Sequence, residues 1–289
     1  MQPAFRKVVI FGAGLIGGSF ALALRKAEAV SEVVGFGRSA ATLEQARQFG
    51  ILDRIGKDEA AEVRDADLVL LATPVAQMAA IFARIAPHLG THTLLTDGGS
   101  TKGDVVAAAR ANLGAKLARF VPAHPIAGAE LSGPAAALEN LYLGKRVVLT
   151  PLPENSSESV ARVRQAWLLC GANVSELTPE QHDEVFAAVS HLPHLLSFAL
   201  VHDLAQRENK DQLLSFAASG FRDFTRIAAS SPEMWRDICL ANRDALLREL
   251  LQYVNELHGL YQALEQHDAA KLEEVFSEAR KVRSNWNPQ

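Results

Sequence analysis

The sequence is poor in the features that mark several classes of protein. Two cysteines in 289 residues, Cys170 and Cys239, are too few for the disulfide framework of a small secreted protein. Both lie in apolar surroundings, so we expect buried free thiols, with a disulfide as the alternative. We see no apolar run approaching the roughly 18 residues that a membrane-spanning helix needs, and no signal peptide before the first strand pattern. We therefore expect a cytoplasmic protein with no membrane partner.

Neither sign of charge is in large excess. The chain has 29 Lys and Arg against 33 Asp and Glu, which gives a formal net charge of −4. A basic surplus is typical of proteins that bind nucleic acid or anionic membranes, so we expect neither partner. The length of 289 residues suits one large domain or two ordinary ones.

Short apolar runs alternate with helical patterns through the first 177 residues. This alternation is typical of a parallel sheet covered by helices on both faces. Two further runs flank a helix at 157–169, and we expect them to extend the same sheet. The predicted strands are 8–11, 33–36, 67–72, 93–96, 118–122, 146–150 and 173–177, and the other predicted helices are 15–26, 41–49, 76–85 and 104–112.

The pattern changes at Thr178. The segment Thr178-Pro179-Glu180-Gln181 has the form of a helix start with a capping box, and no strand pattern follows as far as Ala279. We therefore predict an α/β Rossmann-type dinucleotide-binding domain at 1–177 and an all-α domain at 178–289. Apolar residues from Leu247 to Leu264 recur at three- and four-residue steps, a stripe that either packs in a core or forms a dimer seam.

A G-x-G-x-x-G pattern follows the first predicted strand and opens the first predicted helix. Gly12 permits the tight turn, Gly14 lets the backbone approach a pyrophosphate, and Gly17 lets the helix pack closely on the strand. In this setting the pattern favours a dinucleotide site over a glycine turn without a ligand. We also assign four neighbouring residues to cofactor binding. Leu15 and Ile16 lie within the glycine motif, and Thr73 and Pro74 follow the predicted strand at 67–72.

The second strand ends at Gly37-Arg38-Ser39, where an NAD-binding unit usually has Asp or Glu. A carboxylate would repel a 2′-phosphate, whereas Arg38 with the hydroxyl of Ser39 would bind it. We therefore expect NADP to be preferred, with NAD possible. In the alternative, Arg38 is a solvated surface residue or stacks on adenine without selecting the phosphate.

Polar residues follow the predicted strands at 93–96 and 118–122, at the edge of the sheet where ligands bind. Ser100 lies in the loop 97–102, and His124 follows the strand at 118–122, so both should be near a nicotinamide. A hydroxyl-bearing substrate that loses a hydride needs a base for its hydroxyl proton, and His is the usual choice near neutral pH. In the alternative, His124 is a structural hydrogen-bonding residue.

The helical half also carries polar candidates. His191 and His194 can share one helix face, but no further ligands stand at metal-binding spacing, so we expect no metal site. An arginine in the segment 220–226 could hold a carboxylate through two hydrogen bonds. From this segment alone, a surface ion pair with Asp223 is the better interpretation.

Taken together, these segments resemble the prephenate/arogenate dehydrogenases of tyrosine biosynthesis. The first matching motif is shared by many dehydrogenases, whereas the last four are much more specific. The motifs stand in the family's order and span most of the chain: GAGLIGGS at Gly12–Ser19, TDGGSTK at Thr96–Lys102, HPIAGAELSG at His124–Gly133, SHLPH at Ser190–His194, GFRDFTRIA at Gly220–Ala228 and MWRDI at Met234–Ile238.

The resemblance implies a Rossmann domain, a helical dimerisation domain and a homodimer. It also implies oxidative decarboxylation of prephenate, arogenate or both, with hydride transfer to NAD(P). In the family's pattern, His124 deprotonates the substrate hydroxyl and Ser100 orients His124 and the nicotinamide. His194 contacts the substrate and Arg226 holds a substrate carboxylate. The pocket entrance is shaped by Glu130 and Asp223.

Two departures from the family pattern matter. Many members have an acidic residue where this chain has Arg38-Ser39, which supports NADP. The chain leaves no room for a fused mutase or regulatory domain, so any inhibition by tyrosine would act at the active site. Two rival functions are a hydroxy-acid dehydrogenase of similar plan and a non-catalytic dinucleotide sensor, and the SHLPH and DFTRIA segments argue against the first.

Overall fold

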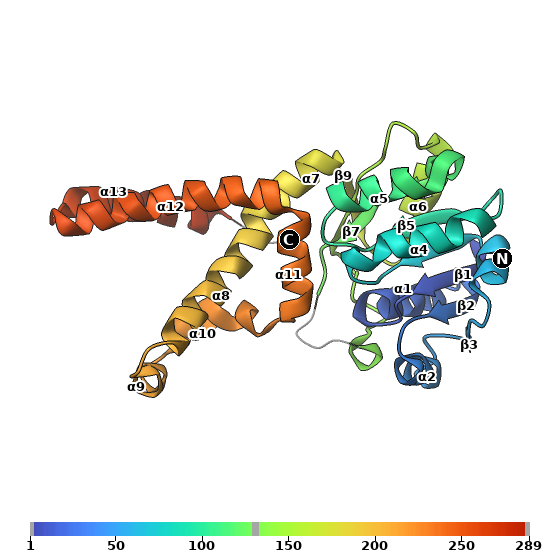
Figure 1. Ribbon diagram of the computed structural model, residues 1–289, viewed down its shortest axis with the longest axis horizontal. Helices are drawn as coiled ribbons and strands as arrows, with labels where there is room; N and C mark the ends of the chain where they lie inside the picture. Colours follow the sequence, from blue (N-terminus) through green and yellow to red (C-terminus); the bar gives the residue numbers. More distant parts are fainter. Residues whose placement is uncertain (1–2, 129–132, 287–289) are drawn as a thin grey trace.

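The computed structural model describes residues 3–128 and 133–286. Figure 1 shows an α/β domain beside an elongated helical domain. The α/β domain is built on a six-stranded parallel sheet in the order β3-β2-β1-β4-β5-β6. These strands are β1 (Phe5–Phe11), β2 (Val30–Phe36), β3 (Arg54–Ile55), β4 (Leu68–Leu71), β5 (Leu94–Asp97) and β6 (Phe120–Val121).

Helices cover both faces of this sheet, as the sequence predicts. One buried apolar cluster includes Phe20 of α1 and Trp167 of α6, and the other includes Phe82 of α4 and Val105 of α5. Continuous apolar strands such as β4 are buried on both faces for this reason. The helices are α1 (Leu15–Lys26), α2 (Ala40–Gln48), α3 (Glu59–Arg64), α4 (Met78–Ile85), α5 (Gly103–Leu113) and α6 (Ser157–Leu169), with short turns η1 (Val75–Gln77), η2 (Ala86–His88), η3 (Gly114–Arg119) and η4 (Pro134–Ala136).

The expectation that the runs at 146–150 and 173–177 extend the main sheet is wrong. They form β8 (Arg146–Leu149) and β9 (Asn173–Glu176) of a separate three-stranded sheet with β7 (Ala123–Pro125). Strands β7 and β8 are antiparallel, and β8 and β9 are parallel. Pro122 stands between β6 and β7, and a proline cannot donate the N–H that would continue the β6 ladder. His124 therefore lies in β7, within the second sheet.

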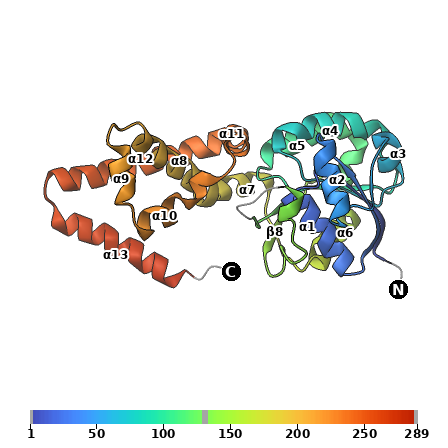
Figure 2. The same cartoon turned by 90° about the horizontal axis from the view of Figure 1, so that it is seen from below.

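The second half of the chain is helical in the part that the structure describes. Its first helix begins with the predicted capping box between Thr178 and Gln181. Figure 1 shows α12 and α13 projecting away from the α/β domain, and Figure 2 shows that they diverge from the turn that joins them. The elements are α7 (Pro179–Phe186), η5 (a π turn, Ala187–His191), α8 (Leu192–Ala205), α9 (Lys210–Ser215), α10 (Ser219–Thr225), η6 (Arg226–Ala229), α11 (Pro232–Ala241), α12 (Arg243–Glu265) and α13 (Ala269–Asn285).

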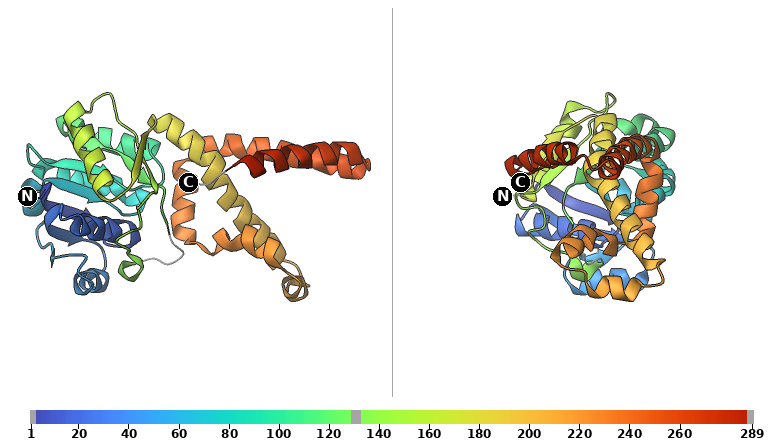
Figure 3. Two further views of the ribbon diagram at one scale, coloured as in Figure 1. Left: turned by 180° about the vertical axis from the view of Figure 1, so that it is seen from behind. Right: turned by 90° about the vertical axis from the view of Figure 1, so that its left-hand side faces the viewer.

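The apolar stripe of α12 is not part of a core within this chain. Six of its side chains keep 47–64% of their surface exposed, and the two views of Figure 3 show α12 and α13 standing clear of the sheet. A contiguous exposed apolar face of this kind marks a surface that another molecule covers. The exposed members are Leu247, Leu251, Val254, Leu257, Tyr261 and Leu264.

The sequence predicted no apolar run long enough to span a membrane, but one helical stretch has the length and composition for it. The continuous helix from Pro179 to Ala205 is long and apolar enough by composition, with a mean hydropathy of 1.4 in its best window, of which 28% is buried. The helices of soluble proteins can pass the same test. His182 and Asp183, near the start of this stretch, form hydrogen bonds with the α/β domain. The first turns of the helix therefore pack against protein. Cys170 and Cys239 are free thiols, as predicted, but only Cys170 is buried, whereas Cys239 is partly exposed.

Candidate active site

The glycine turn between β1 and α1 has the geometry that the sequence predicts. Gly12 has a φ of +95°, and a Cβ there would stand 2.5 Å from the carbonyl oxygen of Ala72. A Cβ on Gly17 would stand 2.1 Å from the carbonyl oxygen of Gly12, so this helix packs on the turn only without a side chain. Nothing lies within 4 Å of the Cβ position of Gly14, the N-cap of α1, which has no side-chain cap. Open space and free N–H groups at this point fit a pyrophosphate.

A cleft of about 610 Å³ lies over this turn, between the two domains. Predicted site residues on its α/β wall are Gly14, Leu15, Ile16, Thr73, Pro74 and Ser100. The opposite wall comes from the helical domain, and includes Met234, Asp237 and Ile238 of α11. Gly12 and Gly17 shape the turn beneath and are not part of this lining. The size of the cleft is within the usual range of small-molecule and cofactor sites.

Arg38 and Ser39 stand apart from this cleft, at the carboxyl end of β2. Both are exposed. The hydroxyl of Ser39 accepts a hydrogen bond from the backbone N–H of Thr42, 3.2 Å away, and so caps α2. Its O–H remains able to donate to a phosphate oxygen, because accepting one hydrogen bond leaves the hydroxyl proton free.

Behind the Ser100 loop, a buried ion pair joins β5 to β7. Asp97 and Lys102 are both fully buried and bound to each other. Lys102 Nζ donates to the carbonyl oxygen of Ala123 at 2.9 Å, and Asp97 Oδ1 accepts from the N–H of Ala123 at 3.0 Å. The pair therefore holds the backbone immediately before His124. Neither residue was predicted to belong to the site, although both lie in the TDGGSTK segment.

His124 contacts a residue that the sequence analysis missed. Its Nδ1 lies 2.8 Å from Nε2 of His182, and Nδ1 of His182 lies 2.8 Å from Oδ1 of Asp183. Asp183 also accepts from the N–H groups of Lys102 and Gly103, each at 2.8 Å. The resemblance implies that Ser100 orients His124. In the structure, His182 contacts Nδ1 of His124. The one available signal was that His182-Asp183 directly follows the capping box of α7.

Burial keeps these histidines neutral. It lowers the pKa of His124 well below its usual value, and the neighbouring His182, Lys102 and His191 act in the same direction. Burial also lowers the pKa of His182, and the hydrogen bond that His182 donates to Asp183 opposes this without reversing it. Burial alone would raise the pKa of Asp183, but its hydrogen bonds from His182 and the two backbone N–H groups outweigh that, and the pKa is lowered. At neutral pH the site holds two neutral imidazoles beside one carboxylate.

The substrate-side candidates lie on the helical domain. The ring of His194 stacks on Trp235 with centroids 3.6 Å apart, and its Nδ1 lies 2.8 Å from the carbonyl oxygen of Ser190. Burial lowers the pKa of His194, and the charge of Arg226, at the start of η6, adds to this effect. Asp223 is exposed and lies 3.9 Å from Arg222, the surface pairing that the segment alone favoured. Glu130 lies outside the described residues.

His191 has a different environment from His194. It is buried, its Nδ1 lies 3.0 Å from Nδ2 of Asn242, and burial lowers its pKa to about 4. The two histidines of SHLPH therefore do not form one site. Across residues 3–128 and 133–286, no group of three or more His, Cys, Asp or Glu side chains is arranged to hold a metal ion.

A parallel sheet with this glycine turn, a cleft above it and a helical second domain define a nicotinamide-dinucleotide dehydrogenase. Residues 20–176 match the nucleotide-binding domain of prephenate dehydrogenase, and residues 178–278 match its dimerization domain. The chain belongs to the prephenate dehydrogenase family.

Relatives of known name agree. The chain is 37% identical to prephenate dehydrogenase of Bacillus subtilis over 96% of this chain and 75% of that protein. It is 35% identical to cyclohexadienyl dehydrogenase of Zymomonas mobilis, over 98% and 96%. Among solved structures, prephenate dehydrogenase from A. aeolicus in complex with hydroxyphenyl propionate and NAD+ superposes with a TM-score of 0.90 at 36% identity, over 96% of this chain and 97% of that one. Arogenate dehydrogenase of Synechocystis superposes with a TM-score of 0.82 at 29% identity, over 97% and 100%.

Proposed function

We propose that this protein oxidatively decarboxylates arogenate, prephenate or both, to tyrosine or 4-hydroxyphenylpyruvate, in tyrosine biosynthesis. The observation that carries the proposal is His124, a histidine kept neutral by burial and held by hydrogen bonds at the carboxyl edge of the sheet. The names of the relatives support the substrate class, and the A. aeolicus enzyme binds a hydroxyphenyl compound with NAD+. In this assignment, residues 1–177 hold the cofactor and residues 178–289 hold the substrate and the dimer partner.

A nicotinamide bound in the cleft would supply the acceptor for the hydride that leaves the hydroxyl-bearing ring carbon. His124 takes the hydroxyl proton as the hydride leaves. The electron pair of the ring–carboxylate bond then flows into the ring as carbon dioxide departs. The ring becomes aromatic, and its phenolate oxygen regains a proton. The protein's contribution is to position the substrate and to transfer this proton.

The other site residues have binding roles in this proposal. Arg226 holds a substrate carboxylate, and His194, fixed by its stacking on Trp235, contacts the substrate. By analogy with the family, Asp223 and Glu130 help to shape the pocket entrance. Ser100, which lines the cleft, orients His124 and contacts the nicotinamide in this proposal.

We further propose that NADP is preferred over NAD. Gly37-Arg38-Ser39 brings a cation and a hydroxyl, rather than a carboxylate, to the end of β2. Arg38 is exposed and so is accessible to a 2′-phosphate. The A. aeolicus relative was solved in complex with NAD+. We therefore propose that this chain also uses NAD, less efficiently than NADP.

Steady-state kinetics with prephenate and arogenate, each with NAD and NADP, test the function. We expect cofactor reduction with at least one substrate, and higher kcat/KM with NADP. Absence of turnover in all four combinations, with cofactor still bound, would favour the non-catalytic sensor. Turnover of a simple hydroxy acid alone would favour the other rival.

We also propose a homodimer formed through the helical domain, in a cytoplasmic enzyme. The exposed stripe of α12 supplies the apolar face, and residues 178–278 match a dimerization domain. Light scattering at micromolar concentration should give twice the chain mass. Leu251→Glu, in the middle of the stripe, should favour the monomer, whereas Glu256→Lys, a polar exchange on the same helix, should not. A wild-type monomer would contradict the proposal.

A further inference from the structure

We infer that Asp183 and His182 are positioning residues that place the single ring proton of His124 on Nδ1, so that Nε2 of His124 is the basic atom. The inference rests on the proposed function in one respect, that His124 is the base. It adds the chemical reason why one of the two ring nitrogens can accept a proton. It also gives a role to the buried His182 and the partly buried Asp183, which no motif in the sequence singled out.

Asp183 is held as a carboxylate by two backbone donors. Its Oδ1 accepts from the N–H of Lys102 and its Oδ2 accepts from the N–H of Gly103, both at the start of α5. These two donors stabilise the charged carboxylate. A carboxylate has no proton to give. The contact of 2.8 Å between Oδ1 and Nδ1 of His182 is therefore a hydrogen bond that His182 donates.

The hydrogen bond to Asp183 also determines which nitrogen of His182, and then of His124, carries the proton. A neutral imidazole carries one N–H and one lone pair. With its proton on Nδ1, the fully buried His182 presents a lone pair at Nε2, which lies 2.8 Å from Nδ1 of His124. Two lone pairs would repel at this distance, so Nδ1 of His124 carries the hydrogen. The lone pair of a neutral His124 is then on Nε2.

The surrounding groups hold this arrangement and disfavour a second proton. Phe186 packs against both imidazoles, with ring centroids 4.8 Å from His124 and 4.5 Å from His182. The ammonium of Lys102 lies on the carbonyl of Ala123, next to His124, and opposes a positive charge there. Of the other titratable groups near the two rings, His191 disfavours the charged form of His124, whereas Asp97 favours that of His182.

The arrangement crosses the domain boundary. His124 and the start of α5 belong to the α/β domain, whereas His182 and Asp183 belong to α7 of the helical domain. Asn242, at the start of α12, donates to the backbone carbonyl of Asp183 at 2.7 Å and so extends the contact further into the helical domain. The protonation pattern of His124 therefore depends on the docking of the two domains.

Nitrogen-15 NMR of the full-length protein labelled on histidine tests the inference directly at pH 7. We expect the rings of His124 and His182 each to carry the proton on Nδ1 with Nε2 unprotonated. Loss of the corresponding signals in His124→Asn and His182→Gln assigns the two rings. A proton on Nε2 of His124, or a doubly protonated ring in either residue, would overturn the inference.

Kinetics give a second test. His182→Leu removes the acceptor, and we expect kcat to fall by at least roughly 10-fold, because the proton of His124 can then occupy the nitrogen that should act as the base. The KM for the cofactor should stay within about twofold, because His182 is absent from the cleft lining. His182→Gln should recover part of kcat, because its side-chain oxygen can accept from Nδ1. Equal kcat in the Leu and Gln variants and the wild type would count against the inference.

The two proposals can fail separately. If NMR shows the expected protonation while His124→Asn turns over normally, the assignment of His124 as base fails and the protonation pattern stands. If His124→Asn is inactive while Nε2 of wild-type His124 carries the proton, the base assignment stands and this inference fails.

Discussion

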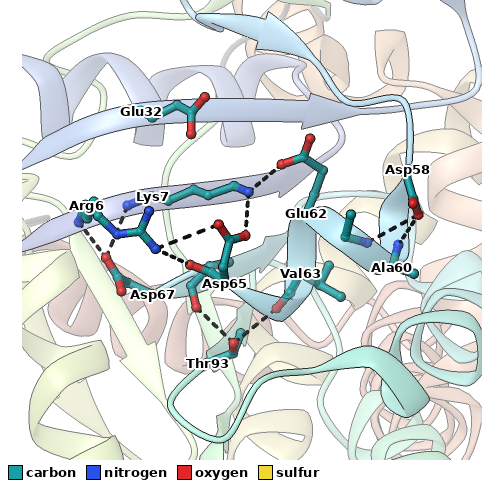
Figure 4. A network of polar contacts seen from close by, with 12 residues as sticks. Arg6, Lys7, Glu32, Asp58, Ala60, Glu62, Val63, Asp65, Asp67 and Thr93 are labelled. Atoms are coloured by element: carbon teal, nitrogen blue, oxygen red, sulfur yellow. Dashed lines mark hydrogen bonds and ion pairs between the residues drawn. The ribbon is translucent and has the colours of Figure 1, made fainter.

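Two polar networks lie at opposite ends of the same parallel sheet, and they differ in how they carry charge. At the amino end, Lys7 of β1 binds Glu62 of α3 and Asp65, as Figure 4 shows. At the carboxyl end, His124 and His182 lie in a row that ends at Asp183. Every group in the first network is charged, whereas the two histidines of the second are neutral.

The amino-end network is held by paired charges. Arg54 of β3 joins it by binding both Glu62 and Glu32. The hydrogen bond from Arg54, aided by Lys7, lowers the pKa of Glu62 to about 2 despite partial burial. Burial alone would lower the pKa of Lys7, but the hydrogen bonds that it donates to Asp65 and Glu62 outweigh this and raise it. No proton moves in such a network near neutral pH.

The difference shows what separates a structural polar cluster from a reactive one. Opposite charges placed together drive each group toward its charged form, and none can accept or release a proton near pH 7. Burial without a full set of counter-charges keeps an imidazole neutral with a lone pair available. We therefore expect changes at the carboxyl end to affect turnover and changes at the amino end to affect stability.

The largest expected effect is on turnover. His124→Asn should lower kcat by roughly 10²–10⁴-fold, the usual scale for a general acid–base residue. Thermal unfolding and cofactor titration should change little, because Asn fills similar space and His124 is absent from the cleft lining. Near-normal turnover would remove His124 from the mechanism and break the contrast between the two networks.

The counterpart at the amino end is Lys7→Met. We expect about 3 kcal/mol of lost unfolding free energy, the low end for removing one partner of a buried pair, since Asp65 keeps 56% of its side-chain surface exposed. Urea unfolding measures this loss, and kcat should be unchanged. Lys26→Met is the matched control, because the Lys26–Glu139 pair is exposed and should contribute less than about 1 kcal/mol. A large drop in kcat with intact stability would contradict the contrast.

The two networks should also respond to acid in different pH windows. The folded pKa of Glu62 is about 2 against an ordinary 4.5, so its contribution is complete above about pH 5 and is lost as the pH falls toward 2. We expect about 2 kcal/mol, allowing for the solvent that Glu62 retains. The histidines have lowered pKa values, so the unfolded chain binds their protons first and stability falls from about pH 6.5 downward.

Glu62→Gln separates these contributions. In urea unfolding at a series of pH values, the slope of the variant below pH 4.5 should be shallower than that of the wild type, because Asp183 still contributes there, whereas the slope just below pH 6.5 should be kept. An unchanged slope between pH 4.5 and 3 would show that Glu62 does not stabilise the folded protein by its charge.

The smallest expected effect is at an exposed charge outside both networks. Arg38→Ala should weaken NADP binding by roughly 10-fold relative to NAD, because one charge-assisted hydrogen bond in solvent contributes about 1.4 kcal/mol. Fluorescence titration with both cofactors measures the ratio. Equal loss for NADP and NAD would mean that Arg38 does not read the 2′-phosphate.

Much of the fold was predictable because its signals are local. The helices at 15–26 and 157–169 have the expected bounds, and the capping box at Thr178 begins a helix as predicted. The two-residue strand β3 was missed because so short a run has no detectable periodicity. The second sheet was missed because apolar alternation does not specify which strand pairs with which.

The site residues that could be predicted are likewise those with local signals in the sequence. The cleft residues after β1, β4 and β5 were found, because a glycine turn and strand-end loops are readable over a few positions. His182 was missed because it lies 58 positions from His124 and no spacing rule connects the two. The buried pair of Asp97 and Lys102 was missed because its role depends on β7, whose place in the fold was mispredicted.

By itself, the sequence determined the parallel sheet, the glycine turn after β1 and the change to helices near Thr178. Hydrophobic periodicity, turn chemistry and helix capping act within a few residues, so they can be read along the chain. Only the tertiary structure decided that His124 meets His182 and Asp183 from the other domain. The affinity of a ring nitrogen for a proton depends on burial and on the groups within hydrogen-bond distance, and only folding brings those groups together.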